Sequence, residues 1–308
     1  MNLLITGACG HIGSYLVNNI HKIKKIKKVY LIDHLQQGSI NSLFNIKKKS
    51  FFSFHLIDLS VPHSLDYFKK MDIVIHCASM TNAADSFKVK SEMYRNNLNA
   101  FKNVINFCIN KKSKLVHISS TSVYGKSDGI VDENCNKKYL KPQSPYAKIK
   151  LLEENILKKN TNKIKYTTFR FGTIVGASAG MRFHTAANSF CFNAATGDSI
   201  KVYKTAIHQF RPYLSIRDSF KVFKFVIDNN FFKNDVFNAI SSNYTVNQIL
   251  SKIKKVIKKI KITYISTPIM NQLSYHVAKS KLSKKGLVLN AKIDFDINKT
   301  LKLFKYLS

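Results

Sequence analysis

The chain has 308 residues, of which 45% are hydrophobic and 22% are charged. This composition is normal for a globular protein that buries one large core or two closely packed ones. It excludes a helical membrane protein, because no run approaches the roughly 18 apolar residues of a membrane span, and we expect no membrane partner. The first residues, MNLLITGACG, lack the charged region and cleavage site of a signal peptide, so none is expected.

The five cysteines are scattered, odd in number and without the spacing of metal ligands. We interpret them as reduced thiols, which predicts a cytoplasmic protein with no metal site. They are Cys9, Cys77, Cys108, Cys135 and Cys191.

Lysine and arginine outnumber aspartate and glutamate by 50 to 17, which gives a formal net charge of +33. Such an excess fits binding to nucleic acid or to an anionic membrane. We favour a general lysine bias and expect no nucleic-acid partner, because the excess is spread over the whole chain. Lysine clusters at 21–28 and 251–261 contain Ile and Val at helical spacing, which predicts amphipathic surface helices. Four of the five arginines lie close together in the sequence: Arg170, Arg182, Arg211 and Arg217.

The first half of the chain alternates short apolar runs with helical patterns. Strands are predicted at 2–6, 28–33, 51–58, 72–78, 114–120 and 166–172, and crossover helices at 91–111 and 144–159. Alternation of strands and helices indicates a parallel sheet that is covered on both faces.

After residue 173 the pattern loosens into a loop, a predicted helix at 185–196 and a predicted strand at 211–216. Lysine-rich helices and one short strand are expected in the C-terminal part. The sequence therefore predicts an α/β fold: a doubly wound parallel sheet that binds a dinucleotide, with a smaller α/β part packed on it and interleaved with it.

Three glycines, Gly7, Gly10 and Gly13, lie between the first predicted strand and the next helical run. Their missing side chains permit a tight turn and let backbone N–H groups approach a pyrophosphate at a helix N-terminus. Asp33 ends the second strand, where a carboxylate binds the hydroxyls of an adenosine ribose and repels a 2′-phosphate. The spacing favours NAD over NADP, with a purely structural turn as the alternative. Asp58, which ends the third strand, is a candidate adenine contact or a strand-end cap.

Two tyrosines are followed by a lysine four residues later, Tyr146 by Lys150 and Tyr275 by Lys279. On a helix, residues four apart lie on the same face. With 14 tyrosines and this many lysines, about two such pairs arise by chance, so the pair alone is not diagnostic.

The glycine turn, the Tyr146/Lys150 pair and the stretches HISSTSVYG, SPYAKIKLLEE, FRFGTIVGAS and FRPYLSIRD occur in one chain in this order. With them, the sequence resembles the extended short-chain dehydrogenase/reductases, and in particular the NAD-dependent nucleotide-sugar epimerases and dehydratases. The resemblance implies a Rossmann domain for NAD at 1–173, to which 211–240 returns, and a domain for a nucleoside-diphosphate sugar at 174–210 and 241–308. It also implies a homodimer.

The resemblance further implies a catalytic set of Ser120, Tyr146 and Lys150. Tyr146 would be the general base, since a nearby ammonium favours its phenolate over the phenol, whose free pKa is about 10. The implied cofactor-binding residues are Gly7, Gly10, His11, Ile12, Gly13, Asp33, Asp58, Leu59, Cys77, Ala78, Ser79, Asn97, Tyr146 and Lys150. The implied substrate-binding residues are Ser122, Thr173, Arg182, Asn188 and Arg211.

Departures from the family pattern narrow the reaction. Dehydratases that resemble this chain carry Asp-Glu directly after the position of Ser120, where this chain has Thr121 and Ser122. A related reductase class carries cysteine at the position of Ser122. What remains is chemistry like that of a 4-epimerase, with a dehydrogenase that stops at the keto sugar, or a non-catalytic binder of NAD or nucleic acid, as alternatives. Thr173 stands where epimerases often have asparagine.

Overall fold

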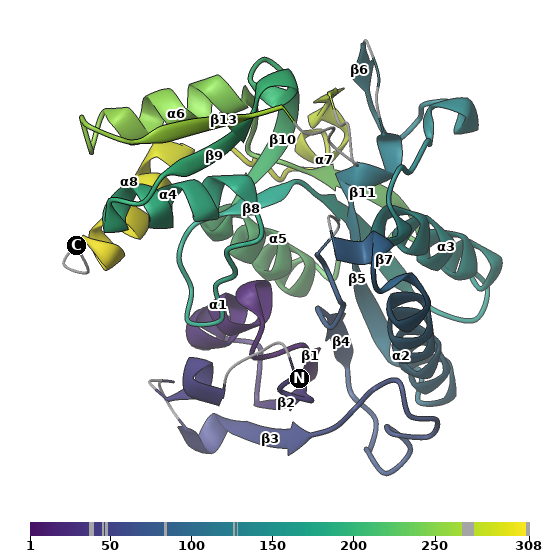
Figure 1. The fold of residues 1–308 in the computed structure, drawn as a ribbon. Coiled ribbons are helices and arrows are strands. Elements are labelled where there is room, and N and C mark those ends of the chain that lie inside the picture. The colour runs from purple at the N-terminus through teal and green to yellow at the C-terminus, as the bar shows by residue number, and fades with distance from the viewer. Residues whose placement is uncertain are drawn as a thin grey trace.

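The computed structural model describes residues 1–36, 40–44, 46, 49–82, 85–125, 127, 129–266 and 274–305. Within these residues, seven parallel strands form the central sheet (Figure 1). They are β1 Asn2–Thr6, β2 Lys28–Asp33, β3 Phe52–Leu56, β4 Ile73–His76, β5 Lys114–Ser120, β7 Tyr166–Phe171 and β11 Val236–Ala239. Their order is β3-β2-β1-β4-β5-β7-β11, so the chain winds outward in both directions from the junction of β1 and β4. The predicted doubly wound parallel sheet is confirmed.

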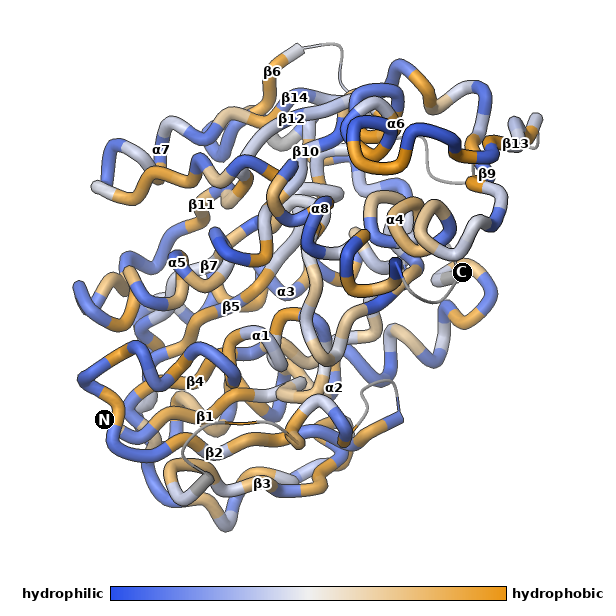
Figure 2. Tube along the Cα trace, turned by 90° about the vertical axis from the view of Figure 1, so that its left-hand side faces the viewer, coloured by the Kyte–Doolittle hydropathy of each residue, from blue (hydrophilic) through white to orange (hydrophobic). Residues whose placement is uncertain are grey.

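Helices cover both faces of this sheet. Helices α1 His11–Asn19 and α5 Ile216–Asp228 lie on one face, and α2 Lys90–Asn110 and α3 Pro145–Lys159 on the other (Figure 1). In β1, Leu3 and Ile5 share a core cluster with Leu16 of α1, whereas Leu4 shares another with Phe101 of α2. Successive side chains of a strand point to opposite faces, so an uninterrupted apolar run fits a sheet buried on both sides. Figure 2 shows this apolar character along β1, β2 and β4.

A smaller part packs beyond the edge where the central strands end. Its three-stranded sheet has the order β12-β10-β8, and the pairs β9–β13 and β6–β14 flank it. The bounds are β6 Ile130–Val131, β8 Thr173–Val175, β9 Ile200–Tyr203, β10 Phe210–Ser215, β12 Ser242–Thr245, β13 Ile262–Ile265 and β14 His276–Val277. The helices are α4 Ala186–Thr196, α6 Val246–Lys254, α7 Ser280–Ser283 and α8 Ile293–Phe304. The predicted helix at 185–196 and strand at 211–216 correspond to α4 and β10.

Short 3-10 helices complete the described structure. They span Ile20–Lys22, Ile40–Leu43, Lys49–Phe51, Asp85–Phe87, Thr121–Tyr124, Lys137–Tyr139 and Lys204–Ala206. Among the helices of the described residues, none has the length and apolar character that crossing a membrane requires.

Three sequence predictions about the lysine-rich segments are wrong. The segment 21–28 is not a helix: one 3-10 turn ends at Lys22, and β2 already begins at Lys28. Its isoleucines, Ile23 and Ile26, are 1% and 7% exposed and fill the core as part of a loop, so their spacing reflects burial without a helix. The predicted helix at 251–261 ends with α6 at Lys254. After residue 240 the chain forms β12, β13 and β14, where one strand was expected, because strands only two to four residues long leave little periodicity.

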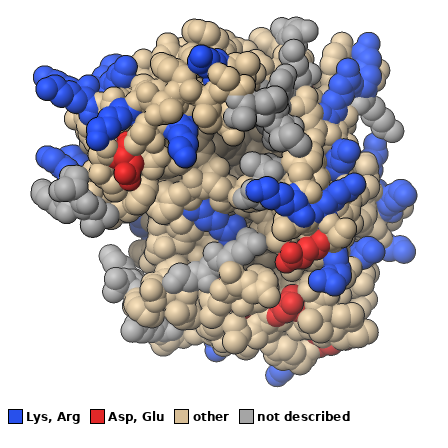
Figure 3. Space-filling model, in the orientation of Figure 1, with Lys and Arg blue, Asp and Glu red and all other residues tan. Residues whose placement is uncertain are grey.

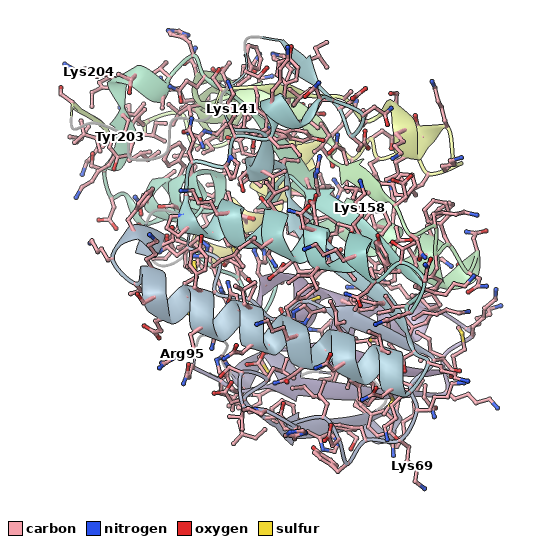
Figure 4. The ribbon with its side chains drawn as sticks, turned by 90° about the vertical axis from the view of Figure 1, so that its right-hand side faces the viewer. Lys69, Arg95, Lys141, Lys158, Tyr203 and Lys204 are labelled. Carbon is pink, nitrogen blue, oxygen red and sulfur yellow. The ribbon has the colours of Figure 1, made fainter. Side chains whose placement is uncertain are left out.

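Basic side chains are scattered over the surface. On the face in Figure 3, Lys and Arg are spread widely, with few acidic side chains among them. Lys69, Arg95, Lys141 and Lys158 are exposed and come from separate parts of the chain (Figure 4).

A buried ion pair fastens α3 to the sheet. Glu154 of α3 accepts hydrogen bonds from Arg170 of β7 at 2.9 and 2.7 Å and from the Ser119 hydroxyl of β5 at 2.6 Å. The Arg170 guanidinium lies 4.8 Å from the ring centre of Tyr124, whose hydroxyl donates to Asn238 of β11. One network therefore ties together the helix and three adjacent strands.

Replacement of Arg170 tests this network. Arg170→Met should lower the free energy of unfolding by about 3–5 kcal/mol, because it leaves the Glu154 carboxylate buried without its cation. The matched control is Lys224→Met, which removes a half-exposed pair with Asp228 and should cost no more than about 1 kcal/mol. Urea denaturation of both variants measures the difference; equal losses would contradict the structural role of the buried pair.

Candidate active site

Two adjoining cavities open where the central strands end. The smaller is lined by the glycine turn after β1, by Asp33 of β2 and by the segment after β4. The larger has a volume of about 560 Å³ and extends from the glycine turn past β5 to the smaller part of the fold. Both share Gly7, Gly10, Cys77, Ser79 and Arg182. Ligands of doubly wound sheets bind at this edge, and the volume is typical of ligand sites.

The glycine turn requires glycine. Gly7 has φ +65°, and a Cβ on it would lie 2.6 Å from the backbone nitrogen of Ala78. A Cβ on Gly13 would lie 2.0 Å from the Gly7 carbonyl oxygen. Gly10 stands directly before α1 and donates its N–H to the Gly7 carbonyl at 3.1 Å. The turn therefore brings bare backbone to the N-terminus of α1, which is an anion-binding arrangement.

Asp33 presents an ionised carboxylate beside this turn. It accepts hydrogen bonds from the backbone N–H groups of Cys9 and Leu35, both at 2.9 Å. Burial would raise the pKa of Asp33, but a hydrogen bond from His34 and the two N–H groups outweigh it and lower this pKa. This position fits the adenosine ribose of a dinucleotide.

The structure gathers most of the predicted cofactor-binding residues around these cavities. Asp58, Leu59, Cys77, Ala78 and Ser79 line the smaller cavity, and His11, Ile12 and Gly13 line the larger one. Asn97 is 2% exposed and holds the backbone of Met80 from both sides, at 2.8 and 3.1 Å. It supports the cavity wall from behind.

Ser120 and Tyr146 line the larger cavity together. Ser120 is the last residue of β5, and its hydroxyl lies 2.8 Å from that of Ser122. Tyr146 stands in the first turn of α3, which Ser144 caps by accepting a hydrogen bond from the Ala147 N–H. Lys150 follows one helical turn later, with Nζ 5.9 Å from the centre of the Tyr146 ring. The pair shares one face of α3, as its spacing predicts.

The charges around Tyr146 act in opposite directions. Burial raises the pKa of its phenol, and the Lys150 ammonium lowers it. The Glu153 carboxylate raises this pKa again, and a hydrogen bond with Ser120 lowers it. The net direction is upward, so in the protein alone the phenol keeps its proton at neutral pH.

Lys150 has a buried partner that the sequence interpretation missed. Its Nζ lies 2.8 Å from Glu153, which is also 3.0 Å from His117, and the other ring nitrogen of His117 is 3.1 Å from the Thr168 hydroxyl. Lys150, Glu153 and His117 are at most 4% exposed. Burial alone would raise the pKa of Glu153, but Lys150 and His117 lower it to about 2. The signal was present in the sequence, because Glu153 follows Lys150 by three residues on one helix.

Four of the predicted substrate-binding residues, Ser122, Thr173, Arg182 and Arg211, line the larger cavity. Asn188 does not: it is fully buried, accepts a hydrogen bond from Gly176 N–H at 3.3 Å and is absent from the described cavity lining. It therefore binds the backbone directly after β8.

The clustered arginines separate into two kinds. Arg182 and Arg211 face the larger cavity. Arg170 is bound to Glu154, and Arg217 is bound to Asp296 at 3.0 Å and stacks on Phe295. Of the four arginines that are close in the sequence, two therefore line the cavity and two are held in ion pairs away from it.

The second tyrosine–lysine pair is not on a helix. Tyr275 and Lys279 flank the short strand β14. Lys279 donates to the carbonyl groups of Ser241 and Leu289, at 2.7 and 2.9 Å. Tyr275 is buried, lines the larger cavity and lies 3.4 Å from the Thr121 hydroxyl. Sequence reasoning missed this position in the wall because the residues that bring it there are distant in the chain. Tyr203 of β9 also lines the larger cavity. Figure 4 labels its position in the smaller part of the fold.

A parallel sheet with this glycine turn, an acidic residue at the end of β2 and a Ser/Tyr/Lys set defines a dinucleotide-dependent class of α/β protein. The family model described as "NAD dependent epimerase/dehydratase family" matches residues 3–239, and the chain belongs to that family.

Curated relatives and solved structures agree with this family. The chain is 26% identical over 275 residues to ADP-L-glycero-D-manno-heptose-6-epimerase of Brachyspira hyodysenteriae, an alignment that covers 86% of this chain and 84% of the relative. It is 29% identical over 164 residues to UDP-glucose 4-epimerase of Yersinia enterocolitica, covering 51% of this chain but only 48% of the relative. The fold matches a dTDP-glucose 4,6-dehydratase of Streptomyces venezuelae, a double mutant solved with NAD and DAU bound, with a TM-score of 0.90, 17% identity and coverage of 99% and 97%. Both epimerases and dehydratases are therefore similar to this chain.

The buried Glu153 makes stability depend on pH in a defined direction. Its pKa is about 2 in the folded protein against a reference value of 4.5. Because the folded value is the lower one, the stabilisation is present above pH 4.5 and is lost as the pH falls toward 2. The free energy of unfolding of the wild type should therefore fall more steeply than that of Glu153→Gln between about pH 5 and about pH 3, and the two curves should converge. Urea titrations at several pH values test this, with Glu92→Gln, exposed on α2, as the control that stays parallel to the wild type.

Proposed function

We propose that this protein is an NAD-dependent nucleotide-sugar epimerase of the 4-epimerase kind. The observation that carries this proposal is the lining of the larger cavity. It contains Ser120 and Tyr146 but, among the described residues, no aspartate or glutamate. A site with a general base for a hydroxyl proton and no carboxyl group to expel water suits oxidation and reduction of one carbon.

The cavity that would hold NAD fits the group. A side chain on Gly7 or Gly13 would clash with backbone atoms, at 2.6 and 2.0 Å from the Cβ. The carboxylate of Asp33 suits ribose hydroxyls and disfavours a 2′-phosphate. We propose residues 1–173 with 211–240 as the NAD-binding part and the remaining segments as the substrate part. When bound, NAD accepts a hydride from the sugar carbon and can return it.

The residues of this chain would manage the proton. Tyr146 takes the proton of the sugar hydroxyl as hydride leaves and gives it back on the return. The Lys150 ammonium lowers the pKa of Tyr146 against the larger effect of burial, and so reduces the cost of forming the phenolate. Ser120, which lines the same cavity wall as Tyr146, holds the reacting oxygen toward it.

The substrate would be a nucleoside-diphosphate sugar. Arg211 and Lys201 line the larger cavity, where among the described residues no carboxylate competes for them. An arginine fork suits the oxygens of a diphosphate.

Two alternatives remain distinct from this proposal. A dehydrogenase that releases the keto sugar would use the same residues and would accumulate NADH. A non-catalytic binder would need no ordered Ser/Tyr/Lys set, so the joint placement of Ser120 and Tyr146 in one cavity wall favours an enzyme.

The role of Tyr146 can be tested against the other tyrosine in the wall. Tyr146→Phe should lower kcat by about 10²-fold or more, because it removes the general acid–base group, and NAD binding should persist. Tyr275→Phe, with its hydroxyl 3.4 Å from Thr121, should leave kcat nearly unchanged. Equal losses of kcat in the two variants would show that Tyr146 is not the general base.

The product tests the reaction class. Thr121 and Ser122 carry no carboxyl group, so the sugar should keep all its oxygens. Incubation with a set of nucleoside-diphosphate sugars and NAD should give a product of unchanged mass, without accumulation of NADH. A loss of two hydrogens with NADH formation would indicate the dehydrogenase. A product lighter by one water would contradict both the epimerase and the dehydrogenase hypotheses and would indicate a dehydratase.

A further inference from the structure

Arg182 reaches into both cavities from the loop between β8 and α4. One nitrogen of its guanidinium lies 3.6 Å from the point where a Cβ on Gly10 would be. Another donates to the Thr81 hydroxyl at 3.1 Å. The guanidinium therefore lies over the glycine turn, next to the N-terminus of α1.

The loop that carries Arg182 is fastened to the glycine turn. The carbonyl of Gly176 lies 2.7 Å from the His11 ring, and Ser178 donates to the His11 carbonyl at 2.8 Å. The N–H of Gly180 donates to the Ser14 hydroxyl at 2.8 Å. A Cβ on Gly180 would lie 2.1 Å from the carbonyl oxygen of Cys9, so loop and turn are in direct contact. These contacts fix the origin of the Arg182 side chain relative to the turn.

Arg182 lines the smaller cavity together with Asp33 and the larger cavity together with Tyr146. Burial lowers the pKa of its guanidinium, and the charges of Asp33 and Tyr146 act in the opposite direction. Asp33 is the proposed ribose contact at the adenosine end, and Tyr146 is the proposed base at the reacting end. The pyrophosphate of a dinucleotide lies midway between its two nucleosides. A cation that lines both cavities, next to the glycine turn and the N-terminus of α1, matches that anion.

We propose that Arg182 binds the pyrophosphate of the dinucleotide cofactor. This assignment replaces the expectation that Arg182 binds the substrate, and it rests on the proposed use of the site for NAD. The diphosphate of the sugar nucleotide is left to Arg211. The smaller part of the fold thereby contributes a cofactor contact through the loop at 176–182.

Fragments of the cofactor locate the contact. Calorimetry should compare adenosine, ADP-ribose and NAD as ligands of the wild type, Arg182→Gln and Arg182→Lys. Arg182→Gln should weaken ADP-ribose and NAD by about 10- to 100-fold, the range expected for a charge-assisted hydrogen bond, and should leave adenosine unchanged. Arg182→Lys keeps the charge without the fork and should fall between the two. If Arg182→Gln does not fold, the affinities of Arg182→Lys provide the test.

Two controls separate this inference from its alternatives. Arg95→Gln removes an exposed arginine that points into solvent and should bind all three ligands as the wild type does (Figure 4). UDP, tested with saturating NAD present, probes the substrate side and should bind to Arg182→Gln and wild type equally. Unchanged ADP-ribose affinity in Arg182→Gln, or a loss confined to UDP, would overturn the inference and leave the NAD site intact. A wild type that binds neither ADP-ribose nor NAD would overturn the proposed function together with it.

Discussion

Burial of the central sheet on both faces is the constraint on which the candidate site depends. A parallel strand buried on both sides must be followed by a crossover, so every strand ends at the same edge. The glycine turn follows β1, Asp33 ends β2, Cys77 follows β4 and Ser120 ends β5. Residues far apart in sequence meet at this edge because of the topology, before any contact between their side chains is considered.

Carboxylates are scarce in this chain, and several of them are buried. The chain has 17 acidic residues against 50 basic ones, yet Glu153, Glu154, Asp218 and Asp296 are at most 8% exposed. A buried cation is costly without a partner, and Glu153 and Glu154 supply one to Lys150 and Arg170. Asp296 binds Arg217, which is partly exposed. The surface keeps the unbalanced lysines, where water and salt screen them. The large net charge is thus a property of the exterior.

Much of the fold and part of the site followed from the sequence. Most strands of the sheet carry apolar runs, and the spacing of Tyr146 and Lys150 is helical, so local patterns predicted them. The edge strand β11 was not predicted. The contact between Lys150 and Glu153 could have been predicted, because both residues lie on one helix. The contact of Glu153 with His117 could not, because His117 comes from β5. Residues of the cavity wall such as Tyr275 could not be found in this way. Their position depends on how the short strands of the smaller part pair, and such strands have too few residues to show a period.

Consecutive glutamates on α3 have a consequence for how far this side of the larger cavity can move. Glu153 holds Lys150 on its own helix and His117 on β5, and Glu154 holds Arg170 on β7. A sliding or turning motion of this helix would separate the buried Glu154–Arg170 ion pair and break the contact between Glu153 and His117, at a cost of several kcal/mol. The helix that carries Tyr146 is therefore a fixed wall. The opposite wall of the larger cavity includes Ala206 of the 3-10 turn and Ala186, Ser189 and Phe190 of α4, and none of these side chains takes part in those two buried contacts.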